Sequence, residues 1–423
     1  MSDAWVFSGD ERLHLPQVDH FEPPARTVAP QAIDWGVACA AAEPLRTPRL
    51  AVLARGAATV AIAVPDASRP CPTPDILLPL LNELNAGGVP DTGVVVVVGC
   101  GLHRATTRAE KVALVGEQAA ARVEVVDAQG QEQESVDLGS TASGAPIVLN
   151  RRVAEADRVV TVGVVEPHLY AGFSGGVKGV AIGCAGEATI AWTHRPAFID
   201  EAGVTLGRLD GNPFQQTLRD VAARTTLSYA VNVVINERGQ AVAVLAGDPV
   251  TVHASLAAAH RAAWLRPVDG PFDVVVAGIH SPKDQSLYQA SRAATYMALC
   301  DQPALAMGGL ILLAAGVPTG AGDGPGERNF AAVLGSASPD EVIARGLAEP
   351  LGPGGQRAYV MAKVLRGYRV GVLGAHDQSF LSPLGIAAYE SVQDALVDAR
   401  RQLRREPRVL AVADAMNTVV HQR

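Results

Sequence analysis

The sequence has little of the charge and aromatic content that would indicate a disordered or a nucleic-acid-binding protein. Only 18% of its 423 residues are charged and 48% are hydrophobic, whereas a disordered chain needs low hydrophobicity and high net charge. The net charge of −8 argues against nucleic acid as the main partner, because phosphate binding needs basic stripes. Aromatic residues make up 4% of the chain, which leaves few platforms on which single-stranded bases could stack.

The sequence also lacks long apolar runs and paired cysteines. No window of about 18 uncharged apolar residues is flanked as a membrane span would be, and residues 1–5 are not typical of a secretory signal. The five cysteines are widely spaced, with no CxxC pair, so they predict neither a disulfide framework nor a zinc site. We therefore expect a cytoplasmic enzyme with no membrane partner and no nucleic-acid partner.

Short β-branched runs alternate with helical patterns along the chain, which is typical of α/β proteins. Five consecutive valines at 94–98 are too few and too β-branched for a helix and predict a buried strand. Turn-forming residues cluster at 266–271 and indicate a domain boundary. We expect two α/β domains with a cleft between them: a larger N-terminal domain of residues 1–268 plus 405–423, and a smaller C-terminal domain of residues 269–404 that closes the cleft.

The same patterns locate individual elements. Strands are expected at 59–64, 94–98, 123–127, 158–165, 230–235, 241–245, 272–277, 310–314, 369–373 and 409–413. Helices are expected at 75–85, 107–115, 214–224, 250–264, 287–299 and 393–404. The last strand is expected to return to the first domain, which would make the second domain an insertion.

Polar residues follow three of the predicted strands, at the edge of the sheet where ligands bind in open α/β folds. The first group is Asp66, Ser68 and Arg69, which lie directly after a strand with a proline on each side. The guanidinium of Arg69 could hold a substrate carboxylate through two parallel hydrogen bonds, a geometry that a lysine does not provide. The alternative is an ion pair between Asp66 and Arg69 that closes the turn.

The second group surrounds His103, in the segment 99–104 that follows the valine strand. Two glycines in this segment let the backbone approach a ligand closely. Imidazole titrates near neutral pH, so His103 could act as a general acid or base. The alternative is an ordinary solvated loop histidine.

The third group, residues 166–195, is the densest. Six glycines between 172 and 186 argue against a regular helix and predict a loop wrapped around a ligand. Lys178 lies among them, and a lysine in a tight pocket can have a lowered pKa and act as a nucleophile or covalent anchor. The pattern G-x-S-x-G also occurs here, with Ser174 as the possible nucleophile of an acyl hydrolase. That reading needs a strand before the serine and a helix after it, and neither is predicted.

The fourth group opens the first predicted helix of the second domain. Gln289 and Arg292 are three residues apart and share one helix face, whereas Tyr288 points to a different side. If the shared face lines the cleft, Gln289 and Arg292 could reach substrate oxygens across it. The alternative is a helix start with ordinary polar residues.

Together these four groups resemble the nickel-dependent lactate racemase family, over about residues 60–300. The most specific feature is the spacing of His168, Lys178 and His194 around the motif AGFSGGVKG, and the motifs DASRP and GLHR add support. The resemblance implies a racemase or epimerase that acts on a small 2-hydroxy acid, lactate-like or larger. It also implies that the enzymes that make the cofactor are partners.

The cofactor implied by the resemblance is a nickel-pincer nucleotide, a pyridinium-3-thioamide-5-thiocarboxylic acid mononucleotide with nickel, bound by the first domain. Lys178 would attach this nucleotide through a thioamide, and His194 would be the single protein ligand to nickel. The residues that would line its site are Asp66, Ser68, Gly175 and Gly176.

The resemblance also implies roles in the reaction. His103 and His168 would be the acid/base pair on opposite faces of the substrate, and the α-hydrogen would leave and return as a hydride through a 2-keto acid intermediate. A base on each face is needed because the hydride can return to either side. The substrate would be held by Arg69, Tyr288, Gln289 and Arg292.

The residues near Lys178 fit a metal whose other ligands come from elsewhere. Between 166 and 200 there are two histidines and one thiol, Cys184, and no motif that would supply three ligands. A pincer cofactor that brings carbon and sulfur donors would complete the square-planar geometry that Ni(II) favours.

Two departures from the family pattern affect the substrate rather than the catalytic groups. Arg292 replaces the usual lysine, which changes hydrogen-bond geometry, and residues 181–183 do not carry the usual Pro-Gly. A larger or differently charged 2-hydroxy acid is therefore a candidate substrate. The alternative function is a family member that binds the cofactor without racemase activity.

Overall fold

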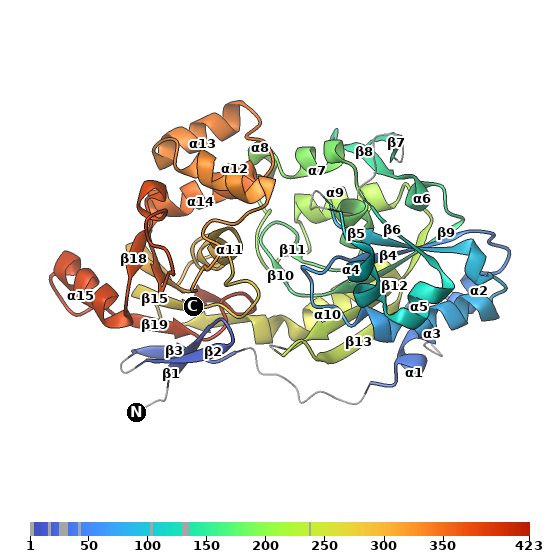
Figure 1. Cartoon of the computed structure of the whole chain (residues 1–423), viewed down its shortest axis with the longest axis horizontal. Coiled ribbons are helices and arrows are strands. Elements are labelled where there is room, and N and C mark those ends of the chain that lie inside the picture. The colour runs from blue at the N-terminus through green and yellow to red at the C-terminus, as the bar shows by residue number, and fades with distance from the viewer. Residues whose placement is uncertain are drawn as a thin grey trace.

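The computed structural model describes residues 4–15, 18–24, 33–40, 44–101, 105–128, 135–236 and 238–423. Two six-stranded sheets form the centres of two lobes, which Figure 1 shows side by side. The first lobe runs from blue to yellow-green, and the second runs from yellow to red and includes the dark blue N-terminal strands. The expected α/β class is confirmed.

The first lobe is built on a sheet in the order β13–β12–β9–β4–β5–β6. Its neighbours are parallel except for the antiparallel pair β12 and β13. Alternate residues of β4 and β5 pack against α3 on one face and against the segment 179–184 on the other. Burial on both faces explains why these strands are continuous runs of valine, alanine and isoleucine. The strands are β4 (Val60–Pro65), β5 (Val94–Gly99), β6 (Glu124–Asp127), β9 (Arg158–Val164), β12 (Leu227–Ile235) and β13 (Ala241–Gly247).

Several helices of this lobe begin at a side-chain cap. Oxygens of Thr107, Asn212 and Asp248 accept backbone N–H groups at the starts of α4, α9 and α10, which satisfies donors that a helix leaves unpaired. The helices are α1 (Trp35–Ala40), α2 (Leu50–Leu53), α3 (Thr73–Ala86), α4 (Arg108–Val115), α5 (Glu117–Arg122), α6 (Arg151–Ala154), α7 (Glu187–Thr193), α8 (Pro196–Ile199), α9 (Pro213–Ala222) and α10 (Pro249–Trp264). Two hairpins complete the lobe: β7 (Ser135–Ser140) with β8 (Pro146–Asn150), and β10 (Pro167–His168) with β11 (Gly172–Phe173).

The second lobe contains a fully parallel sheet in the order β18–β17–β16–β15–β19–β3. Helices α11 to α14 cover one face, and α15 with the hairpin β1–β2 covers the other. The strands are β1 (Ala4–Ser8), β2 (Glu11–Leu15), β3 (His20–Glu22), β15 (Phe272–Gly278), β16 (Leu305–Ala314), β17 (Arg369–Leu373), β18 (Ala387–Tyr389) and β19 (Val409–Val412). The helices are α11 (Leu287–Ala298), α12 (Pro325–Leu334), α13 (Pro339–Ala348), α14 (Gly355–Gly367) and α15 (Val392–Leu403).

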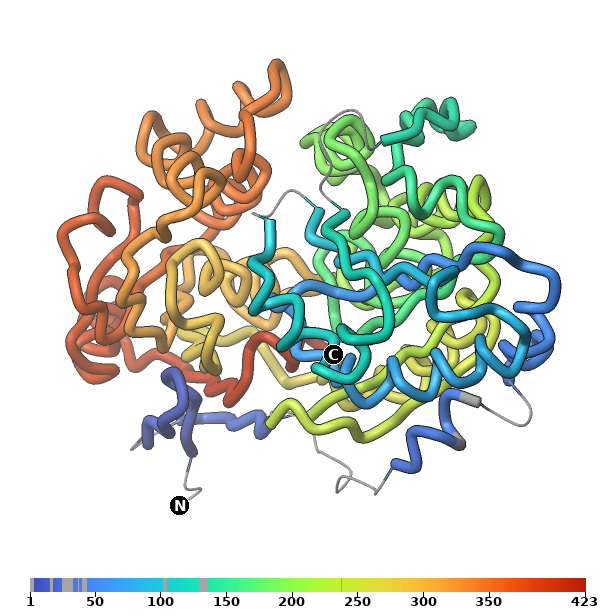
Figure 2. The backbone as a smooth tube through the Cα atoms, turned by 45° about the vertical axis from the view of Figure 1, so that its right-hand side comes forward, coloured from blue at the N-terminus to red at the C-terminus, as the bar shows by residue number. Residues whose placement is uncertain are grey.

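The two ends of the chain meet in the second lobe, not in the first. β19 lies between β15 and β3 of the second sheet, so the expectation that the last strand returns to the first domain is wrong. β20 (Val419–Gln422) pairs with β14 (Leu265–Val268), directly after α10. Figure 2 shows the N-terminal strands in blue below the red C-terminal segment. The error has a physical reason, because an apolar four-residue strand fits the centre of either sheet.

The two lobes share a hydrophobic core and several polar contacts. Phe198 and Phe214 of the first lobe belong to the same buried cluster as α11 and α14 of the second. The Tyr296 hydroxyl donates to the carbonyl of Pro167 at 3.1 Å. Among the described residues, no helix combines the length and the apolar character that a membrane span requires.

Candidate active site

The candidate site lies where β4 and β9 end and the second lobe begins. Arg69 follows β4 and Glu166 follows β9, its neighbour in the sheet. Because the two strands are parallel, both residues leave the same edge of the sheet. From the second lobe, the Nζ atom of Lys283 lies 3.9 Å from the Glu166 carboxylate. The site is therefore built by both lobes.

Glu166 is a buried carboxylate among three cations. It forms an ion pair with Arg69, and the charges of Lys283 and Arg292 also act on it. Burial alone would raise the pKa of Glu166, but the three cations outweigh burial and lower the pKa to about 2. Glu166 is thus ionised at neutral pH and draws cations from both lobes together.

Asp66 and Ser68 form a turn immediately before Arg69. The Asp66 carboxylate accepts hydrogen bonds from the Ser68 backbone N–H at 3.2 Å and from its hydroxyl. The Asp66 carbonyl accepts from the Arg69 N–H at 3.1 Å. The charge of Asp66 acts on Lys178, so this turn faces the lysine. Arg69 forms its ion pair with Glu166.

Glycines shape the loop that carries Lys178. Gly175 and Gly176 have φ values of +88° and +55°, which residues with a Cβ rarely adopt. A Cβ on Gly176 would also lie 2.8 Å from the His253 ring. The Gly176 N–H donates to Asn232 Oδ1 at 2.7 Å. These contacts press the loop onto the first lobe and fix the position of Lys178.

Lys178 is half-buried at the start of the short helical turn η3 (Gly179–Gly183). Burial, followed by the charge of Arg69, lowers the pKa of its ammonium group from 10.5 to about 7. A substantial fraction of Lys178 is therefore a neutral amine at neutral pH. A neutral amine is the form that forms a covalent bond to an electrophile.

His194 lies at the C-terminal end of α7 with one ring nitrogen already engaged. Its Nδ1 is 2.9 Å from the carbonyl of Ile190, so Nδ1–H donates and Nε2 presents a lone pair. Burial lowers the pKa of His194 to about 4, against the opposing effect of that hydrogen bond. A neutral imidazole whose second nitrogen is fixed by a backbone carbonyl is the usual form of a metal-ligating histidine.

His168 is held in the opposite tautomer. Its Nδ1 accepts from the backbone N–H groups of Tyr170 at 3.3 Å and Ala171 at 3.2 Å, so the neutral ring carries its proton on Nε2. Burial, followed by the charge of Lys178, lowers the pKa of His168 well below its usual value. The Tyr170 ring lies 5.9 Å from His168 and 5.8 Å from His194. Tyr170 thus contacts both histidines.

Helix α11 contributes the wall from the second lobe. Its start is capped by Ser286, whose hydroxyl accepts from the Gln289 N–H. Arg292 donates to the Tyr296 hydroxyl at 3.3 Å. The charge of Arg292 acts on Glu166 and His168, so this arginine faces the same region as those two residues. Gln289 is half-buried beside it.

Tyr288 occupies a different side of α11, as its spacing from Gln289 predicts. Its ring packs edge-on against Phe330 at 5.5 Å. The guanidinium carbon of Arg357 lies 5.6 Å from the centre of the Tyr288 ring. Tyr288 therefore positions an arginine from α14.

Ser174 is not presented as a nucleophile. Its hydroxyl is buried, donates to the carbonyl of Val164 at 2.7 Å and accepts from the Glu166 N–H at 3.2 Å. It follows the two-residue strand β11 and precedes a glycine turn rather than a helix. The structure therefore lacks the strand–serine–helix context of an acyl hydrolase, and Ser174 instead anchors the hairpin.

The structure brings together most of the residues predicted for the site. The charges of Lys178, Arg69, Arg292 and His194 all act on His168, so groups more than 200 positions apart in sequence share one region. His103 lies outside the described residues.

Sequence reasoning missed several residues that the structure adds to the site. Glu166 and Tyr170 lie within the segment 166–195, and Lys283 lies six residues before Gln289, so closeness to the predicted site residues was the available signal. Tyr296 lies one helical turn after Arg292, which is a weaker signal. Arg357 lies far downstream in sequence, and no local pattern indicated it.

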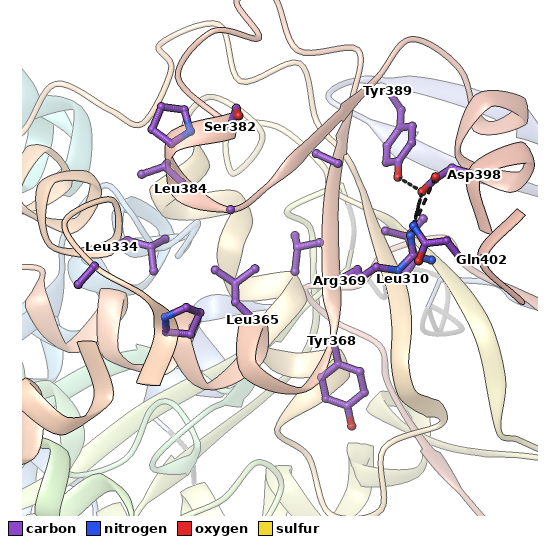
Figure 3. Close-up of a pocket in the computed structure, with 16 residues that line it drawn as sticks. Leu310, Leu334, Leu365, Tyr368, Arg369, Ser382, Leu384, Tyr389, Asp398 and Gln402 are labelled. Carbon is purple, nitrogen blue, oxygen red and sulfur yellow. Dashed lines mark hydrogen bonds and ion pairs between the residues drawn. The ribbon is translucent and has the colours of Figure 1, made fainter. Parts of the chain in front are cut away.

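Among the described residues, neither a protein-built metal centre nor a cavity found in the second lobe competes with this site. In the parts of the chain that the structure describes, no group of three or more His, Cys, Asp or Glu side chains could hold a metal ion. A cavity of about 500 Å³ lies between β17, α15 and the turn η4 (Ser382–Leu384). Figure 3 shows Tyr389 and Gln402 directed at Asp398 there, and these groups are hydrogen-bonded to one another. None of the predicted site residues lines this cavity.

Comparison with known proteins agrees with this geometry. Residues 20–207 match the family model of the lactate racemase N-terminal domain. The chain resembles lactate racemases in this domain. The lactate racemase of Thermoanaerobacterium thermosaccharolyticum is 28% identical over 388 residues, which cover 90% of this chain and 88% of that protein. The lactate racemase of Lactiplantibacillus plantarum is 27% identical over 383 residues, which cover 89% of this chain and 88% of that protein.

Solved structures share the fold of this chain over both lobes. The apoprotein of the lactate racemase from T. thermosaccharolyticum superposes with a TM-score of 0.87 at 24% identity, covering 100% of both chains. A protein from Thermotoga maritima superposes with a TM-score of 0.68 at 14% identity, covering 88% of this chain and 96% of that one. The second lobe therefore belongs to the shared fold.

Proposed function

We propose that this chain is a cytoplasmic racemase or epimerase of a 2-hydroxy acid and that it works with a nickel-pincer nucleotide. The observation that carries the proposal is the shared environment of an amine with a lowered pKa, Lys178, and a neutral imidazole with a free Nε2, His194. The charge of Lys178 acts on His194, so both side chains face one region. Two relatives are named lactate racemase, which supports the same reaction class.

The residues present fit a pincer nucleotide. Lys178 is the amine that would form the thioamide bond, and the lone pair on His194 Nε2 is the single nitrogen ligand that nickel would need from the protein. The glycines at 175 and 176 pack closely against Asn232 and His253, which fixes the position of the lysine. When bound, the cofactor would supply an electrophilic carbon that accepts and returns the hydride. The enzymes that make this nucleotide would be required partners.

Arg69 and Arg292 are the groups that would bind the substrate carboxylate. Both are half-buried and lie at Glu166, from opposite lobes. A guanidinium binds a carboxylate through two parallel hydrogen bonds, so the pair would fix the plane of the substrate. Tyr288 and Gln289 would complete this wall on α11.

His168 and His103 would move the hydroxyl proton on the two faces of the substrate. His168 presents Nε2–H, so in this form it donates to the substrate oxygen, as a neutral imidazole does when it polarises a carbonyl. Its use as a base requires the proton to move to Nδ1, with loss of the contacts to the backbone N–H groups. We assign the second face to His103 from the sequence motif.

The test is to produce the chain together with the cofactor-synthesis enzymes and to incubate it with single enantiomers of a panel of 2-hydroxy acids. We expect bound nickel, a mass increase located on Lys178, and interconversion of the enantiomers of at least one acid. The α-hydrogen should be retained in deuterated water, because a hydride does not exchange with solvent. Nickel-loaded protein that racemises no acid, or rapid exchange of the α-hydrogen, would contradict the proposal.

A further inference from the structure

Arg357 is a cation that the second lobe places at the edge of the candidate site. It lies in the first turn of α14, which follows a glycine-rich turn at 352–355. Its guanidinium lies over the Tyr288 ring, and Tyr288 precedes Gln289 on α11. The packing of Tyr288 against Phe330 holds the aromatic ring in place. Within the described residues, the guanidinium stacks on this ring and pairs with no carboxylate.

Arg357 differs from the other cations near the site in its hydrogen bonding. Arg69 and Lys283 share the Glu166 carboxylate, and Lys363, also on α14, pairs with Asp200 at 2.6 Å. The Nε atom of Arg357 is buried and has no hydrogen-bond partner within the described part of the chain. A buried donor of a charged group is costly to leave unpaired. An acceptor from a bound molecule would remove that cost.

The charge of Arg357 also acts on a different part of the site. Arg69 and Arg292 act on Glu166 and His168, whereas Arg357 acts on Tyr170 and His194. The site therefore has two cationic positions, one near Glu166 and one near Tyr170. A substrate with a single carboxylate would occupy only the first.

We propose that Arg357 is a specificity-determining residue that binds a second carboxylate, so that the preferred substrate is a 2-hydroxy dicarboxylic acid rather than lactate. This inference rests on the proposed function. It names the substrate class that the guanidinium over Tyr288 would recognise, given that its buried Nε has no hydrogen-bond partner among the described residues. The other anionic group that such a guanidinium could bind is the phosphate of the nucleotide, and the experiment separates the two.

The experiment measures kcat/KM for malate and for lactate with the nickel-loaded protein and with Arg357→Met, which keeps the length of the side chain. We expect malate to be preferred, and the substitution to reduce the malate-to-lactate ratio of kcat/KM by about 100-fold, since a charge-assisted bidentate pair is lost. Arg357→Lys should recover part of the ratio because it keeps the charge. Arg366→Met on the same helix, which is exposed and faces Asp340, is the matched control and should leave the ratio unchanged.

Three outcomes would overturn parts of this scheme. If Arg357→Met leaves the malate-to-lactate ratio unchanged while acids are still racemised, the inference fails and the proposed function stands. If the variant loses nickel and nucleotide, measured by metal analysis and intact mass, Arg357 binds the phosphate and the inference is also wrong. If the loaded parent protein racemises neither malate nor lactate nor any acid of the panel, the proposed function itself fails. Calorimetric titration of the loaded protein with malate gives a binding readout that does not depend on turnover.

Discussion

The two walls of the candidate site differ in the kind of chemistry they carry. The first lobe supplies groups whose protonation is altered by burial: Lys178 with a pKa of about 7 and His194 with a pKa of about 4. The second lobe supplies three cationic side chains, Lys283, Arg292 and Arg357. The first wall is therefore suited to bond formation and proton transfer, and the second to binding anions.

Backbone contacts explain why the two walls differ. His168 and His194 each have one ring nitrogen fixed by the main chain, and Lys178 is carried by a loop whose Gly176 lies against His253. The second wall is held by contacts between side chains, such as Arg292 to Tyr296 at 3.3 Å and Arg357 over Tyr288. Substitutions on α11 and α14 would change the second wall and leave the main-chain contacts of the first wall in place.

The largest expected effect comes from removing the amine of the first wall. Lys178→Ala should abolish racemisation and the mass increase of the covalently attached cofactor, because no other amine lies in the glycine loop. Racemisation assays and intact mass measure both results. Lys111→Ala, which removes a lysine paired with Asp127 in the same lobe, should keep both. Full activity of Lys178→Ala with bound cofactor would show that covalent attachment is unnecessary.

Loss of His168 should have the next largest effect. His168→Ala is expected to reduce kcat by about 10²- to 10⁴-fold, the range typical of a general acid or base, while nickel content stays unchanged. The exposed His376 offers a control, and His376→Ala should be neutral. Near-normal turnover of His168→Ala would remove this histidine from the proton-transfer scheme.

Glu166 tests whether the two walls depend on a shared carboxylate. Glu166→Gln leaves Arg69 and Lys283 without their acid, and breaking a buried ion pair costs about 3–5 kcal/mol. We expect a loss of unfolding free energy of this order in urea denaturation. Glu155→Gln breaks an exposed pair with Arg151 and should change stability by less than about 1 kcal/mol. Equal effects of the two substitutions would mean that Glu166 does not hold the lobes together.

The smallest effect expected is a pH dependence of stability in the apoprotein. The pKa of Lys178 is about 7 in the folded chain and near 10.5 when unfolded, so between these values the unfolded state binds more protons. Stability therefore rises with pH over this window through Lys178. Lys178→Met should be more stable than the parent at pH 7, and the difference should shrink as the pH approaches 10. Parallel pH profiles of melting temperature for the two proteins would contradict the lowered pKa.

Much of the first lobe could be predicted from sequence because its signals are local. The valine strand at 94–98 is observed as β5, and the helix expected at 250–264 is observed as α10. The glycine-rich segment was expected to surround Lys178, and the positive φ values of Gly175 and Gly176 explain why glycine is needed. Helices α12 to α14 were not predicted, since proline and glycine interrupt their helical pattern.

The site itself was only partly predictable. Lys178, His168 and His194 lie close in sequence, and the spacing identified them together. Glu166 lies in the same segment, but its role depends on a contact with the other lobe, where the Nζ atom of Lys283 lies 3.9 Å from the carboxylate. Arg357 carried no local signal, because an arginine at a helix start is common and only its buried, unpaired Nε sets it apart.

The sequence alone determined the α/β class, the glycine loop around Lys178 and the resemblance of the chain to the lactate racemase family, because short-range patterning and motif spacing encode these features. Only the tertiary structure decided which sheet receives β19, which nitrogen each histidine presents, and which cations face the site from the second lobe. These depend on contacts between residues far apart in the chain. Such contacts follow from how the lobes pack, and local sequence does not specify them.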